Sequence, residues 1–106
     1  MRLRQKQSLH VKLFGQLIQR AYELGYELTW GDAARIDRRG HMPNSLHYVR
    51  LAVDVNLFVD GEWISDGSHP SWSVLGEYWE NLHPLARWGG RFGDANHFSI
   101  THGGKK

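Results

Sequence analysis

The 106-residue sequence contains no cysteine and no long apolar run. Without cysteine there is no disulfide, no thiolate zinc ligand and no cysteine nucleophile, so a metal site would have to use His, Asp and Glu. No apolar stretch approaches the roughly 20 residues of a membrane-spanning helix, and no signal-peptide apolar segment follows the basic start of the chain. We therefore expect synthesis in the cytoplasm and no membrane insertion.

The composition is that of a soluble globular protein, with 41% apolar and 23% charged residues. The length predicts one domain, residues 1–106, with a single modest core. Residues 1–50 carry nine Lys or Arg against four Asp or Glu, whereas residues 51–106 carry four against seven. The basic half could meet an anionic polymer or form a solvated helix face. Because it lacks an aromatic-basic motif, we expect no nucleic-acid binding.

The hydrophobic periodicity predicts an α+β domain with a small antiparallel sheet and flanking helices. Helices are expected over residues 4–24, with Gly25 after the end, and from Pro70 to just before Pro84. Strands are expected over residues 26–30, 51–59, 62–64 and 97–101, with a hairpin turn at Asp60-Gly61. Residues 33–45 and 87–93 contain turn residues and are predicted to be loops.

Within the strand 51–59, strict alternation places Val53 and Val55 on a core face and Asp54 on the other face. A carboxylate in mid-strand is costly unless it is paired, hydrogen-bonded or bound to a metal. Strand alternation also permits an exposed Asp on a solvated sheet face, and periodicity alone favours that interpretation. Among the aromatic residues, Trp72 and Trp79 have core spacing on the second helix, and Trp88 is a candidate wall of a cleft. His69 and His83 flank that helix beside prolines and are predicted to be loop and cap residues.

Two further features add chemistry to Asp54. His47 lies seven residues upstream, where a loop leads into the strand, and Asp94 precedes His97 by three residues. In hydrolytic zinc sites, a histidine binds the metal while a nearby carboxylate carries the proton of the attacking water. Two His and one Asp as ligands leave a fourth position open for water, as catalytic zinc sites do.

The segments that contain His47 and Asp54, and Asp94 and His97, resemble two motifs of the M15 peptidases. This family comprises D-alanyl-D-alanine carboxypeptidases and dipeptidases and the L-alanyl-D-glutamate endopeptidases of phage endolysins. Residues 45–54, SLHYVRLAVD, are similar to the family motif S-x-H-x-x-G-x-A-x-D, and residues 94–98, DANHF, are similar to its second motif. The resemblance covers about residues 30–100 and implies a Hedgehog/DD-peptidase-like fold. One position departs from the pattern, because Arg50 stands where the family has glycine.

The resemblance implies that His47, Asp54 and His97 bind Zn²⁺ and that Asp94 is the general base. It also implies an oxyanion-stabilising arginine upstream of the first motif, for which Arg35 matches best, with Arg38 and Arg39 as competitors. Ser45 is expected to support the site. Trp88 is the candidate for a substrate-binding wall.

By this resemblance the chain is expected to be a zinc metallopeptidase that hydrolyses peptidoglycan stem peptides, like an L-alanyl-D-glutamate endopeptidase of an endolysin. We expect a monomer that waits in the bacterial host cytoplasm and reaches the cell wall once the membrane is permeabilised. One alternative is a D,D-carboxypeptidase or dipeptidase, for which Arg50 is the candidate cation that holds the substrate carboxylate. The other is an inactive zinc-containing module that binds the wall, since Hedgehog-type domains share this scaffold.

Overall fold

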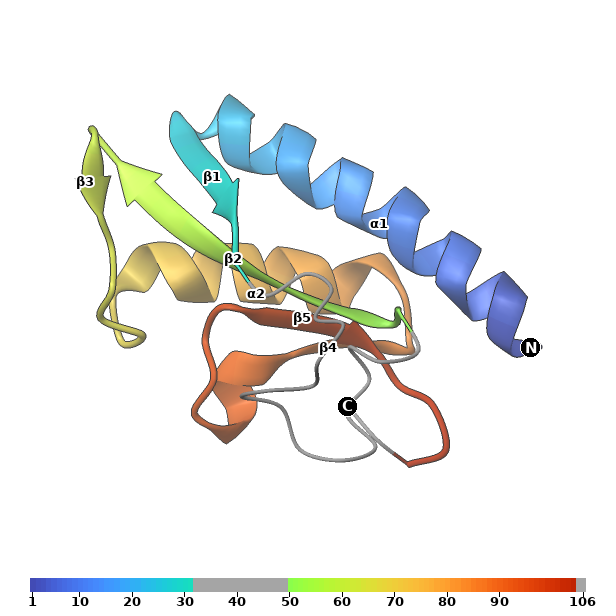
Figure 1. The fold of residues 1–106 in the computed structure, drawn as a ribbon. Coiled ribbons are helices and arrows are strands. Elements are labelled where there is room, and N and C mark those ends of the chain that lie inside the picture. The colour runs from blue at the N-terminus through green and yellow to red at the C-terminus, as the bar shows by residue number, and fades with distance from the viewer. Residues whose placement is uncertain (32–49, 105–106) are drawn as a thin grey trace.

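The computed structural model describes residues 1–31 and 50–104. These described residues form two helices, a small antiparallel sheet and a short 3-10 helix. Figure 1 labels the helices and strands. The helices are α1 (Leu3–Glu23) and α2 (Pro70–Leu82), and the 3-10 helix η2 spans Gly89–Phe92. The strands are β1 (Tyr26–Trp30), β2 (Ala52–Val59), β3 (Glu62–Trp63), β4 (Ala86–Trp88) and β5 (His97–Ile100). The α+β class predicted from the sequence is therefore confirmed.

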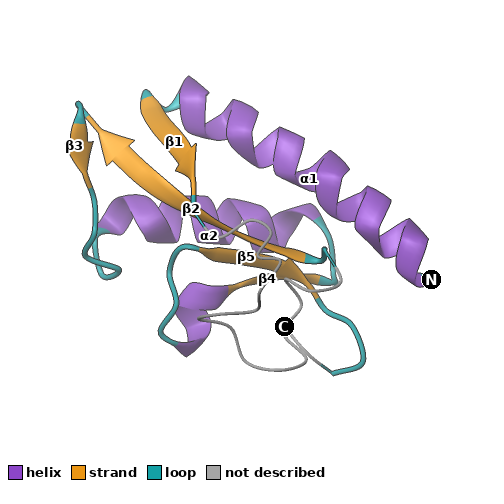
Figure 2. Ribbon diagram, viewed as in Figure 1, coloured by secondary structure: helices purple, strands orange, loops and turns teal. Residues whose placement is uncertain are grey.

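The central strand of the sheet is β2, as the strand order β1-β2-β5-β4 shows. Its first half pairs with β5, through Ala52 to Asp54, and its far end pairs with β3 through Phe58 and Val59. Figure 2 shows β3 beside one end of β2 and β5 beside the other end. This change of partner brings the loops beside β3 and β5 together at one edge of β2.

The core lies between the helices and one face of the sheet. Val53, Val55 and Leu57 of β2 are buried, as the predicted alternation requires, and so are Trp72 and Trp79 of α2. Helix α1 is also tied to β5, because the buried His10 ring forms a 3.1 Å hydrogen bond through Nε2 with the Phe98 carbonyl. Since the helices cover the face with the valines, Asp54 lies on the opposite face of β2.

The turns and helix ends follow the sequence signals. Gly25 ends α1 with a φ of 82°, and Asp60 and Gly61 both have positive φ in the hairpin between β2 and β3. At the start of α2 the His69 side chain accepts a hydrogen bond from the Ser71 amide, and beyond its end His83 accepts one from the Leu85 amide. Both histidines are thus cap and loop residues, as predicted. Among the described residues, no helix is long and apolar enough to cross a membrane.

Strand β4 is a correction to the sequence prediction, which placed the start of a loop at Arg87. Ala86, Arg87 and Trp88 instead pair with Ile100, Ser99 and Phe98 of β5. Three residues are too few to show an alternating pattern, so only the pairing with β5 makes them a strand. Most of the rest of the predicted loop forms the 3-10 helix η2.

Candidate metal and catalytic site

Asp54 and His97 face each other across two paired strands. They are Cα partners in the β2–β5 ladder, so their side chains project from the same face of the sheet. The Asp54 Oδ1 atom lies 3.3 Å from His97 Nδ1, and the two side chains are 15% and 8% exposed. The sheet register alone therefore joins two residues that are 43 positions apart in the sequence.

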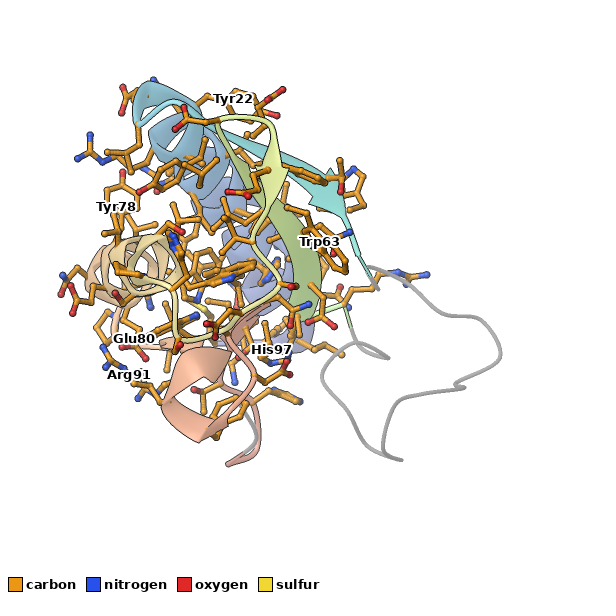
Figure 3. All side chains as sticks on the ribbon, turned by 90° about the vertical axis from the view of Figure 1, so that its left-hand side faces the viewer. Tyr22, Trp63, Tyr78, Glu80, Arg91 and His97 are labelled. Carbon is orange, nitrogen blue, oxygen red and sulfur yellow. The ribbon has the colours of Figure 1, made fainter. Side chains whose placement is uncertain are left out.

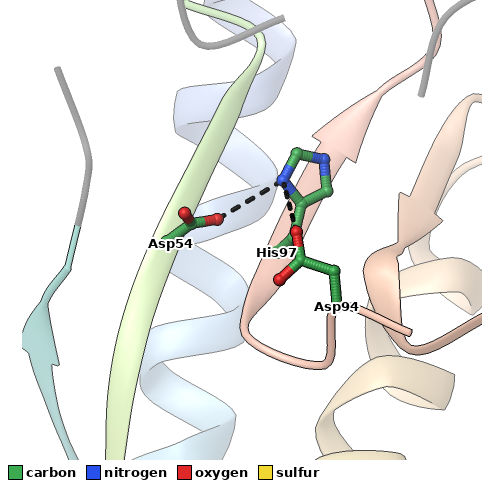
Figure 4. Close-up of side chains that lie close together, drawn as sticks. All are labelled: Asp54, Asp94 and His97. Carbon is green, nitrogen blue, oxygen red and sulfur yellow. Dashed lines mark ion pairs between the residues drawn. The ribbon is translucent and has the colours of Figure 1, made fainter. Parts of the chain in front are cut away.

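Asp94 completes a cluster with these two residues. Its Oδ2 atom lies 3.9 Å from His97 Nδ1, and its side chain is half exposed. Figure 4 shows both carboxylates directed at the same ring nitrogen. Each of the three residues offers one ligand atom, and these three atoms all lie within 4.8 Å of one another.

The donor set and spacing fit a zinc ion. Nitrogen from His and oxygen from Asp are common zinc ligands, with bond lengths of about 2.0–2.2 Å. Two such ligands on a tetrahedral ion lie roughly 3.3–3.5 Å apart. The 3.3 Å between Asp54 Oδ1 and His97 Nδ1 corresponds to one edge of that tetrahedron. These two residues could therefore share a metal without a change of rotamer.

The turn that carries Asp94 and His97 is held by its own carbonyl groups. The Asp94 carbonyl accepts from the His97 amide at 3.1 Å, and the Asn96 carbonyl accepts from the Val55 amide of β2 at 3.1 Å. The Ala95 carbonyl accepts from the Trp88 indole at 2.6 Å. Three successive carbonyls thus have fixed partners, which orients the acid and the histidine before any ligand binds.

Trp88 therefore lies in the core, not on an open cleft wall, with only 6% of its surface exposed. Its ring fills the space that side chains would occupy at Gly76 of α2 and Gly90 of η2. A Cβ atom at either glycine would overlap the indole. The indole N–H of Trp88 holds the Ala95 carbonyl from behind the site.

Gly89 is a positioning residue that the sequence analysis missed. A Cβ atom there would lie 2.6 Å from His97 Cβ and would overlap the Asp94 carbonyl oxygen. The Gly89 carbonyl also accepts a 2.8 Å hydrogen bond from the Asp94 amide. Glycine permits this close backbone approach, and a Gly-Gly pair shortly before an acid-x-x-His motif is the signal that could have indicated it.

Gly31 plays a similar part behind Asp54. Its amide donates a 2.9 Å hydrogen bond to the Asp54 carbonyl, and a Cβ atom there would lie 3.1 Å from that oxygen. Arg50, at the glycine position of the first motif, has a φ of 56°, in the left-handed region that favours glycine. Arg50 therefore has the backbone conformation that glycine favours, and its side chain adds a cation at this position.

Residues 38–100 match the family model described as D-alanyl-D-alanine carboxypeptidase, of the M15 peptidases. That match spans more than half of the chain. The chain belongs to the M15 peptidase family. A comparison with curated proteins finds no match.

The M15 match contains both motifs, so His47, Asp54, Asp94 and His97 all lie within it, as do Ser45, Arg38 and Arg39. Arg35 lies three residues before it begins. The structure brings Asp54, Asp94 and His97 together. His47, Ser45 and the three candidate arginines lie outside the described residues. Their roles stay predictions.

Proposed function

We propose that this M15 peptidase is a zinc-dependent hydrolase of peptidoglycan stem peptides, of the L-alanyl-D-glutamate endopeptidase type found in phage endolysins. The observation that carries the proposal is that Asp54 of the first motif lies beside Asp94 and His97 of the second. One ligand atom from each of the three residues lies within 4.8 Å of the other two. It is supported by membership of a family described as D-alanyl-D-alanine carboxypeptidases, whose substrates are also peptidoglycan peptides.

In this proposal Asp54 and His97 hold the metal together with His47. When bound, zinc polarises the scissile carbonyl and lowers the pKa of a coordinated water. The low exposure of the Asp54 and His97 side chains suits this role, because a buried carboxylate beside a histidine is favourable when both bind a cation. The fourth position would be left to water and substrate.

Asp94 is proposed as the general base. Its carboxylate is half exposed, so it can meet a substrate and exchange protons with it. It lies close enough to the metal ligands to take a proton from the attacking water and deliver it to the leaving amine. An arginine, Arg35 or one of its competitors Arg38 and Arg39, would stabilise the developing oxyanion.

A D,D-carboxypeptidase is the second candidate, favoured by the description of the matching family model. That reaction releases a free C-terminal residue and requires a cation for the substrate carboxylate. Arg50 was the candidate cation, but it borders a groove beside α1 together with Phe14, Trp30 and Val53. Because none of Asp54, Asp94 and His97 lines that groove, this position favours the endopeptidase.

The deciding experiment is product analysis after incubation of the zinc-loaded protein with purified muropeptides. The proposal expects a new amino terminus at D-glutamate, and a chelator should abolish its appearance. Release of D-alanine alone would identify the carboxypeptidase instead, and chelator-insensitive cleavage would contradict the zinc mechanism. No cleavage with zinc bound would favour an inactive wall-binding module.

The proposed biological setting is lysis of a bacterial host, with a monomeric enzyme released from the cytoplasm after membrane permeabilisation. Turbidity of outer-membrane-stripped Gram-negative cells tests this directly. We expect turbidity to fall when the protein is added from outside and to stay constant when chelator is present. Intact turbidity alongside cleavage of soluble muropeptides would remove the lytic role and leave the peptidase activity standing.

A further inference from the structure

A groove of ≈ 270 Å³ begins at Asp94 and leads away from the metal cluster. It lies where β2 changes partner from β5 to β3, between the turn after η2 and the segment after β3. Its lining residues come from β2, from β3 and the following segment, from Trp72 of α2 and from that turn. The polar ones and the exposed indole are Asn56, Trp63, Ser65, Asp94 and Asn96. Asp94 belongs both to the groove and to the three-residue cluster.

Trp63 forms the far end of this groove. It pairs with Phe58 of β2, which lies on the same strand face as Asp54 and Asn56, so the indole and the metal cluster share one face of the sheet. Trp63 is strongly exposed, at 60%. At about 3.3 Å per residue, the four residues from Asp54 to Phe58 span about 13 Å. Figure 3 shows Trp63 and His97 at opposite ends of this region.

The charge of the groove indicates which part of a muropeptide it suits. Among its described lining residues none is cationic, and Asp94 is the one ionisable group. Beyond the L-alanyl-D-glutamate bond, the stem peptide carries several carboxylates, which such a groove would repel. On the other side of the bond, the L-alanine is amide-linked to an N-acetylated sugar, which is uncharged in this linkage.

The remaining chemistry of the groove matches a sugar. An exposed indole offers a flat apolar surface for the C–H face of a pyranose ring, and it has few rotamers to lose on binding. The amides of Asn56 and Asn96 and the hydroxyl of Ser65 can each donate to or accept from hydroxyl and N-acetyl groups. The span of about 13 Å accommodates L-alanine, the lactyl link and one ring, at 3.3–3.6 Å per extended residue.

We propose that this groove is a saccharide subsite that binds the N-acetylated sugar attached to the stem peptide, with Trp63 as the stacking platform. The inference rests on the proposed endopeptidase function, because only a bond next to L-alanine places that sugar within reach. The enzyme would then prefer stem peptides still attached to the glycan over free peptides.

The test compares hydrolysis of a stem tetrapeptide with hydrolysis of the same peptide carrying its N-acetylmuramoyl group. For the wild type, we expect kcat/KM to be higher on the sugar-bearing substrate. Trp63→Ala should lower kcat/KM on that substrate by roughly three- to tenfold, through KM, and leave the free peptide unchanged. Trp63→Tyr, which keeps an aromatic ring, should retain most of the preference. An equal loss on both substrates, or no preference in the wild type, overturns the subsite.

Trp30 supplies a matched control. It is 62% exposed, close to the value for Trp63, but its ring stacks on Phe14 at the helix-covered side. Trp30→Ala should leave the ratio between the two substrates unchanged, whatever it does to stability. A change in that ratio as large as that of Trp63→Ala would show that the preference does not reside in the groove.

A binding measurement separates this inference from the proposed catalysis. N-acetylmuramoyl-L-alanine amide is uncharged and lacks the scissile bond, so its binding requires no hydrolysis. If the wild type cleaves neither peptide, the proposed function fails, and titration of this probe followed by amide NMR decides about the groove. Shifts at Asn56, Trp63 and Asn96 that disappear in Trp63→Ala support the subsite. The absence of such shifts at millimolar probe overturns it.

Discussion

The Cα of Gly89 packs so closely behind His97 that a Cβ atom at position 89 would lie 2.6 Å from the His97 Cβ. The same atom would overlap the carbonyl oxygen of Asp94. A residue of the 3-10 helix, with no functional group of its own, thereby sets where the acid and the histidine lie relative to the sheet.

Gly89→Ala should therefore displace the turn that holds Asp94 and His97. Overpacking of this kind typically costs about 1–3 kcal/mol, and we expect a loss of that size in denaturant unfolding together with weaker zinc binding. Gly15→Ala is the matched control, because a Cβ atom at Gly15 meets nothing within 4 Å. In the middle of α1 that change should stabilise by about 0.5–1 kcal/mol. A Gly89→Ala protein with unchanged stability and zinc affinity would show that the contact is unimportant.

Asp54→Ala and His97→Ala should each remove a metal ligand. We expect zinc content after dialysis to fall from about one equivalent to nearly none, because two remaining ligands do not hold the ion at neutral pH. The controls are Glu27→Ala, an exposed carboxylate of β1, and His102→Ala, whose ring contacts Lys6. Both should keep full zinc content. Retention of zinc by the Asp54 and His97 variants would refute the ligand assignment.

Asp94→Asn should separate binding from catalysis. The amide keeps the shape of the side chain but takes up no proton, so kcat should fall by about 10²–10⁴-fold while zinc content stays near one equivalent. The measurement pairs metal analysis with muropeptide turnover on the same sample. Loss of zinc in this variant would make Asp94 a ligand and not the base.

Asp66 provides a pH prediction away from the site. Hydrogen bonds from the Ser68 amide, and then from its hydroxyl, lower the pKa of the Asp66 carboxyl below the ordinary value of 3.8. A carboxyl with a lowered folded-state pKa contributes stability above its unfolded pKa, and this is lost as pH falls through the folded value. The stability difference between wild type and Asp66→Asn should therefore be constant near neutral pH and shrink below pH 3.8. Urea unfolding from pH 7 to pH 3 measures it, and a difference that grows on acidification would contradict the assignment.

The elements with strong local signals followed from the sequence. The periodicity of α1 and the alternation of β2 placed Leu17 and Val55 in the core, where both are buried. Local patterns work here because a helix or strand has to bury one face, whatever its partners are. The same alternation showed that Asp54 leaves the core face, but not whether it meets solvent or another side chain.

Tertiary structure decided what Asp54 meets. Its proximity to His97 comes from the register between β2 and β5, which no local pattern specifies. Strand β4 and the burial of Trp88 likewise depend on pairing with β5 and on space left by Gly76 and Gly90. The sequence by itself determined which residue types were available for a zinc site. Long-range packing decided which of the described residues converge, because bringing distant positions together depends on contacts that local propensity does not encode.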